Sequence, residues 1–246
     1  IFGLVLLVWA WIKHRASRVF VGIAVTMVFI IFEALIGAGI VLKELVTDDA
    51  SAARAIIISI HLVNTLMLTG AASLTAWWAG GHKLPAWRET KDATKWLLPL
   101  ALFGLVATSM AGAVTALGDT LFPVDPTVGV GAGLFAHVRE DVSAANHFLV
   151  RLRVAHPVIA VVVSAGLVWI ANIVRSRSQA GRATKAWSWI VMALVGAEVG
   201  FGLLNIVLHA PGWLQLGHLM LAQLLWIATL LMGASMLQPR RAAPTT

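Results

Sequence analysis

Apolar and polar residues alternate along this chain in long blocks, not at the short periods of soluble helices or strands. A helix needs about 20 mainly apolar residues to cross a bilayer. Six apolar stretches reach this length and a shorter seventh one opens the chain, which predicts an all-α integral membrane protein with seven transmembrane helices. The stretches cover residues 1–12, 19–42, 54–78, 96–117, 148–175, 187–209 and 212–236.

Composition excludes several classes of protein. Hydrophobic residues make up 59% of the 246 residues, charged residues make up 12%, and the mean hydropathy is +0.88. An ordinary soluble domain does not have this balance. Cysteine is absent, so the chain has no disulfide, no thiolate metal site and no catalytic thiol.

The net charge of +7 reflects topology. Of the 18 basic residues, 13 lie in alternate connections and in the C-terminal tail, on one predicted side of the membrane. The positive-inside rule makes this side cytoplasmic. We therefore predict a multi-pass protein of a prokaryotic plasma membrane with a cytoplasmic C-terminus, and a nucleic-acid partner is not needed to explain the charge.

Three of the eight histidines lie clearly inside apolar stretches, away from their ends: His61, His156 and His218. Each is close to the predicted outer end of its helix, so we expect all three at one depth. Ionisable residues inside a membrane are expensive and commonly functional. One such histidine is more often a packing residue than a ligand, but three at matched depth favour a ligand site.

The spacing of these residues indicates an internal duplication. His156 and His218 are 62 residues apart, and the position 62 residues before His61 lies before Ile1. The segments "FEALIGAGIVL" and "AEVGFGLLNIVL" also correspond, with Glu33 and Glu198 in helices that precede a histidine helix. We predict two four-helix halves, residues 1–90 and 91–246, with the first helix of the N-terminal half preceding this chain. For both glutamates we favour a structural role over a functional one.

Two imidazoles on facing helices suit one chemistry especially well, because neutral histidines ligate haem iron from both faces. The sequence has no HExxH motif, and further zinc ligands at this depth are not evident. A proton relay through His and Glu is an alternative. Arg151 and Arg153 precede His156 by about one turn, where they would pair with haem propionates; snorkelling to the interface explains them equally well.

Four segments together resemble heme A synthase, of the cytochrome oxidase assembly family: "RVAHPVIA", "AIIISIHLVNTLMLT", "LQLGHLMLAQLLW" and "AGAVTALGDTLFP". The resemblance implies eight spans in two pseudo-symmetric four-helix bundles. It implies that His156 and His218 ligate the iron of a haem b, and that His61 is one of two ligands of the substrate haem. The catalytic glutamate is expected in a Glu-x-x-x-His-Arg segment before Ile1.

The reaction so implied is oxidation of the C8 methyl of haem O to a formyl group, which gives haem A. Expected partners are haem O, membrane lipid and haem O synthase; the electron donor and the formation of a homo-oligomer stay open. For the long 118–147 connection two readings stay open, a cap over the outer site and a merely flexible loop. The alternatives are a bis-His di-haem electron carrier that resembles the ascorbate-reducible b-type cytochromes, and a transporter built from repeats.

Overall fold

The computed structural model describes residues 1–46, 48–83, 85, 87, 93–123, 143, 146–178 and 180–238. Within these residues every regular element is a helix, which confirms the all-α prediction. Six spans are long and apolar enough to cross a membrane, so the chain is a multi-pass membrane protein. The helices are α1 (Phe2–His14), α2 (Arg18–Leu42), α3 (Ala52–Ala79), η1 (Ala93–Trp96), α4 (Leu97–Leu121), α7 (Phe148–Leu152), α8 (Ala155–Ser176), α9 (Arg182–Val207) and α10 (Gly212–Met236).

The ends of these helices differ from the predicted stretches where local chemistry intervenes. The first stretch forms α1, an apolar helix of 13 residues that is shorter than the six spans. The fifth stretch is interrupted between α7 and α8, just before Pro157. Proline lacks an N–H donor and disfavours helical backbone in the preceding residue, so it is suited to the first turn of a helix and not to its interior.

Helices α2 and α9 end in the same way. Beyond α2, Glu44 has φ 56° and the Leu45 N–H donates to the Ile40 carbonyl over 3.0 Å. Beyond α9, His209 has φ 57° and the Ala210 N–H donates to the Asn205 carbonyl over 2.7 Å. A left-handed residue with a hydrogen bond back across the last turn is a common helix stop. The two helices that carry Glu33 and Glu198 therefore end with the same backbone geometry. The two left-handed residues are 165 residues apart, which is also the separation of the two glutamates.

Helices α4, α8, α9 and α10 form a ring in which each helix contacts two ring neighbours; the contact between α4 and α10 is the least extensive of the four, and α3 packs beside it against both helices. The order around the ring is α4, α8, α9, α10, so α8 lies diagonally opposite α10. The main hydrophobic core fills this bundle and includes the fully buried side chains of Leu167, Val191 and Met232. The bundle coincides with the predicted C-terminal half.

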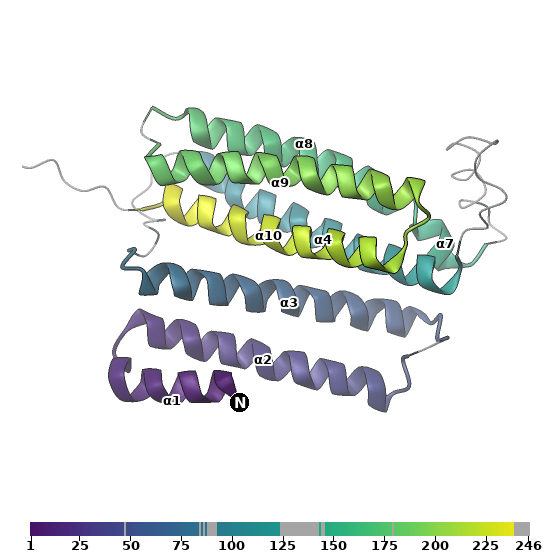
Figure 1. Ribbon diagram of the computed structural model, residues 1–246, viewed down its shortest axis with the longest axis horizontal. Coiled ribbons are helices and arrows are strands. Elements are labelled where there is room, and N and C mark those ends of the chain that lie inside the picture. Colours follow the sequence, from purple (N-terminus) through teal and green to yellow (C-terminus); the bar gives the residue numbers. More distant parts are fainter. Residues whose placement is uncertain are drawn as a thin grey trace, which may run out of the picture.

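Helix α3 joins this bundle to α2 and α1, as Figure 1 shows from top to bottom. It packs against both α4 and α10. The indole N–H of the buried Trp226 on α10 donates to the Leu66 carbonyl on α3 over 2.7 Å, and Thr69 donates to Gln223 over 2.9 Å. These bonds fix the register between the two predicted halves; the boundary near residue 90 stays a prediction.

Candidate functional site

The three histidines singled out from the sequence lie on helices that run in the same direction. Helices α3, α8 and α10 all begin at the end of the molecule where α7 lies (Figure 1). His61, His156 and His218 are closer to the N-terminal than to the C-terminal end of these helices. The fold therefore brings all three toward one end of the molecule.

His156 and His218 face each other across the C-terminal bundle. Their ring centroids are 6.3 Å apart and their planes are inclined by 77°. They come from α8 and α10, the diagonal helices of the ring, so the space between them lies in the core of the bundle. Core positions on facing helices are where four-helix bundles build metal and cofactor sites.

A neighbouring acceptor holds the Nδ1 atom of each ring. Nδ1 of His156 lies 3.2 Å from the backbone carbonyl of Thr108 on α4, and Nδ1 of His218 contacts the Glu198 carboxylate on α9. Glu198 is buried. An acceptor at Nδ1 favours the tautomer that carries its proton there and leaves the Nε2 lone pair available. This arrangement is the one in which a histidine serves as a metal ligand.

Two glycines stand beside the rings. A Cβ added to Gly112 on α4 would lie 3.0 Å from Cε1 of His156, and one added to Gly202 on α9 would lie 3.6 Å from Cε1 of His218. The His156 ring can therefore lie in its present position only because Gly112 has no side chain. Helices α4 and α9 are the other diagonal pair of the ring. Beside the histidine rings each of them has a glycine, so no side chain fills the space there.

These residues fit a bis-histidine metal centre. Two imidazoles that share one ion through Nε2 place their ring centres about 6 Å apart, because each metal–nitrogen bond is about 2.0–2.1 Å and the ring centre lies about 1 Å beyond the nitrogen. The observed 6.3 Å meets this requirement. The described residues contain no group of three or more His, Cys, Asp and Glu that could hold an ion, so a two-ligand centre whose other ligands come from a macrocycle fits better than zinc.

The two arginines predicted to bind propionates lie in different environments. Arg151 is exposed on α7. Arg153 lies in the break before α8, where its Nε is 2.7 Å from a carboxylate oxygen of Asp119 and Nη2 donates to the carbonyls of Gly118 and Phe122. Its guanidinium therefore binds the C-terminal end of α4 to the start of α8. The propionate role of both arginines stays a prediction.

His61 belongs to a separate polar cluster between α2 and α3. Its Nε2 is 3.5 Å from Oε1 of Glu33, and its buried Nδ1 has no hydrogen-bond partner among the described residues. The same carboxylate accepts hydrogen bonds from Asn64 and, over 2.5 Å, from the Thr65 hydroxyl. His61 thus does not share the site of the other two histidines, and its assignment to a second haem stays a prediction.

Sequence reasoning missed the contacts that hold these histidines. Glu33 and Glu198 were noticed and a structural role was favoured for both; the structure adds that each contacts the histidine of the helix that follows it. The available signal was the order shared by the two halves, a glutamate helix and then a histidine helix. Thr108 contributes a backbone carbonyl, which no residue type reveals, and nothing in the sequence distinguishes Gly112 from the other glycines of the apolar stretches.

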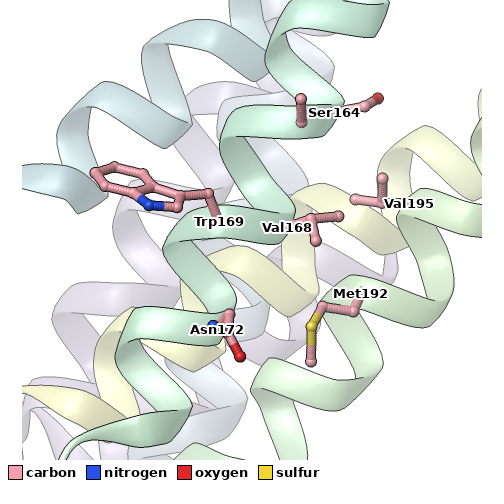
Figure 2. Close-up of a pocket in the computed structure, with 7 residues that line it drawn as sticks. Ser164, Val168, Trp169, Asn172, Met192 and Val195 are labelled. Atoms are coloured by element: carbon pink, nitrogen blue, oxygen red, sulfur yellow. The ribbon is translucent and has the colours of Figure 1, made fainter.

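An open groove lies elsewhere on the bundle, between α8 and α9. Figure 2 shows Val168, Trp169 and Asn172 on one side of it and Met192 and Val195 on the other. Trp169 is 57% exposed, so the groove is on the outer surface of the bundle. It also lies further along α8 than His156 and is distinct from the histidine site. The 118–147 connection falls largely outside the described residues.

The fold and the site together define a class of protein: a multi-helix membrane protein with paired intramembrane histidines. Residues 1–230 match the family model described as cytochrome oxidase assembly protein. The chain therefore belongs to the cytochrome oxidase assembly protein family, the heme A synthase family, which confirms the resemblance found in the sequence.

Two curated relatives are similar to most of the chain. Both are named protoheme IX farnesyltransferase and come from two strains of Thermus thermophilus. Each is 37% identical over 238 residues, which is 96% of this chain but 37% of the relative. The chain thus spans little more than a third of the length of these relatives. No solved structure matches it.

Proposed function

We propose that this chain is the haem-oxidising component of cytochrome oxidase assembly, a heme A synthase. The observation that carries the proposal is the facing pair of His156 and His218 in the bundle core, each with Nδ1 held by an acceptor. The family match supports it independently. A haem b held by this pair would supply one-electron redox chemistry next to the substrate site.

The residues divide the work between two sites. His156 and His218 bind the resident haem, Thr108 and Glu198 orient their rings, and Gly112 leaves the His156 ring the room that it occupies. His61 lies on α3, which packs against α10, the helix of His218; this neighbourhood suits electron transfer between a substrate haem and the resident one.

The proposed substrate is haem O. Two hydroxylations of its C8 methyl give a geminal diol, and loss of water leaves the formyl group. In sum one methyl group and one dioxygen give one formyl group and one water, so the four electrons lost by carbon are gained by oxygen. The relatives' name describes farnesyl transfer to protohaem, which supports a farnesylated haem as substrate and a haem farnesyltransferase as partner.

The proposed location is the plasma membrane of a prokaryote, with the histidine end of the bundle outward and the C-terminus in the cytoplasm. The distribution of basic residues supports this orientation. A farnesylated substrate is strongly apolar, so it would reach the sites from the lipid phase.

The reaction is tested in cells that carry each variant at the native locus, by extracting membrane haems and separating haem O from haem A. His61→Ala and His156→Ala should each abolish haem A and cause haem O to accumulate. His209→Asn is the matched control, because His209 is exposed and asparagine tolerates its left-handed backbone. If haem A is unchanged in the His61 and His156 variants, the proposal is overturned. If the parent binds haem but forms no haem A, the electron carrier is favoured.

A further inference from the structure

Each half of the molecule pairs a glutamate with a histidine, but the carboxylates face different ring nitrogens. Glu198 contacts Nδ1 of His218, whereas Glu33 lies 3.5 Å from Nε2 of His61. In a neutral imidazole the nitrogen that faces a carboxylate carries the proton and the other keeps its lone pair. His218 therefore offers Nε2 to an incoming metal, while Nε2 of His61 faces the Glu33 carboxylate across a longer and weaker contact.

The two carboxylates also differ in their other partners. Glu33 accepts hydrogen bonds from Asn64 and Thr65, which follow His61 on α3. The positions that follow His218 at the same spacing are Leu221 and Ala222, which have no side-chain donor. Within the described part of the chain, the polar contact of the Glu198 carboxylate is His218. The Glu198 carboxylate thus depends on His218 for its polar contact, whereas the Glu33 carboxylate keeps two hydrogen bonds without His61.

This difference decides how easily each histidine moves. A buried carboxylate that loses its only partner is left without compensation, which is among the most costly changes in a protein interior. Movement of His218 away from the buried Glu198 carries this cost. Movement of His61 does not, because two donors remain on Glu33 and because the 3.5 Å contact is long for a hydrogen bond.

We propose that Glu198 and Glu33 are positioning residues with opposite effects on the two haem sites. Glu198 fixes His218 with Nε2 free, so its site retains a resident haem. Glu33 holds Nε2 of His61 in a resting contact that the iron of the haem substrate displaces, so this site releases its haem. The inference rests on the proposed function and deepens it, because a substrate site must exchange its ligand and a redox site must not.

The test is a titration of the detergent-purified chain with haem, followed by optical spectra and transfer of bound haem to an excess of apo-globin. Glu198→Gln should weaken binding at the His156–His218 site by about 10–100-fold, the usual effect of losing a residue that orients a metal ligand. It should also raise the reduction potential, because a neutral amide makes the His218 imidazole a weaker donor to iron. Glu44→Gln, at an exposed residue beyond α2, is the matched control and should change neither quantity.

The His61 site is measured in a chain that also carries His156→Ala and His218→Ala, so that the first site is absent. There Glu33→Gln should bind haem severalfold more tightly and release it more slowly than its Glu33 parent, because a neutral amide competes less for Nε2. Equal, weaker or undetectable binding by the Glu33→Gln chain overturns the role of Glu33.

The outcomes separate this inference from the function on which it rests. A parent chain that binds no haem through His156 and His218 contradicts the proposed function. If the parent binds haem normally and the Glu198→Gln and Glu44→Gln variants have the same affinity and the same reduction potential, the positioning role alone is contradicted. A loss of affinity without a shift in potential reduces Glu198 to a packing residue and also contradicts it.

Discussion

Gly112 is the position where a single methyl group should disable the His156–His218 site. In Gly112→Ala the new Cβ would lie 3.0 Å from Cε1, 3.4 Å from Nδ1 and 3.5 Å from Nε2 of His156. Carbon atoms in contact prefer about 3.5–4.0 Å, so the ring must retreat by roughly 0.5 Å or more. The bond from Nδ1 to the Thr108 carbonyl is already 3.2 Å long, and such a retreat takes it beyond hydrogen-bond range.

The expected cost has two parts. The lost hydrogen bond is worth about 1 kcal/mol, and forcing a methyl group into a packed core costs about 1–3 kcal/mol. The sum corresponds to a loss of roughly 30-fold to nearly 1,000-fold in haem affinity if it is all expressed in binding, since 1.4 kcal/mol is a factor of ten. The assay is an optical haem titration of the purified chain, with the amplitude of the low-spin spectrum as a second measure of the ligand geometry.

Gly166→Ala is the control for this experiment. Gly166 lies on α8 like His156, and a Cβ there would meet nothing within 4 Å. Alanine is also the better helix former, by about 1 kcal/mol, so this variant should bind haem like the parent and be at least as stable. A Gly112→Ala chain with parental affinity and spectrum would show that His156 does not need this space, and would refute the reasoning.

Three further variants test the packing around the sites by thermal unfolding in detergent. Arg153→Lys should lower the free energy of unfolding of the haem-free chain by about 1–3 kcal/mol, because one amine cannot keep the guanidinium's contacts to the end of α4; unchanged stability would leave Arg153 free for a propionate role alone. Trp226→Phe should cost about 0.5–1.5 kcal/mol by removing the indole hydrogen bond to the Leu66 carbonyl, which still accepts from the Thr69 hydroxyl, and a neutral effect would contradict the role of that bond in joining α3 to α10. Gly22→Ala should cost about 1–3 kcal/mol, because its Cβ would lie 2.2 Å from the Thr75 hydroxyl; a stabilised protein would show that α2 and α3 separate easily.

The helices could be predicted from sequence because each long apolar stretch has only one satisfactory structure in a membrane. Without water, every backbone polar group must bond within its own segment, so hydropathy alone gives the fold class and the approximate bounds. The interruption before α8 was not predicted, since residues 148–175 were expected to form one helix, although Pro157 is disfavoured inside a helix and lies just after the break. The short helix α1 shows the limit of this reasoning, since apolar character does not fix where a helix begins.

The partners of the histidines could not be predicted in the same way. Whether Glu198 faces His218 or lipid depends on the rotation of α9 about its axis, which the packing of the whole bundle decides. The acceptor for His156 is the backbone carbonyl of Thr108, and every residue has such a carbonyl. Sequence spacing led to the prediction of which residues belong to the sites, and only the tertiary structure shows which atoms contact the three histidines.

The central claim is that His156 and His218 together hold one haem in the core of the C-terminal bundle. The most direct test is the optical spectrum and the haem-to-protein ratio of the purified chain beside His156→Ala and His218→Ala. We predict a low-spin b-type spectrum in the parent that is lost in both variants, while their helical content stays the same. A parent that folds but stays free of haem in spite of an ample supply, or a low-spin spectrum that survives either substitution, would contradict the claim.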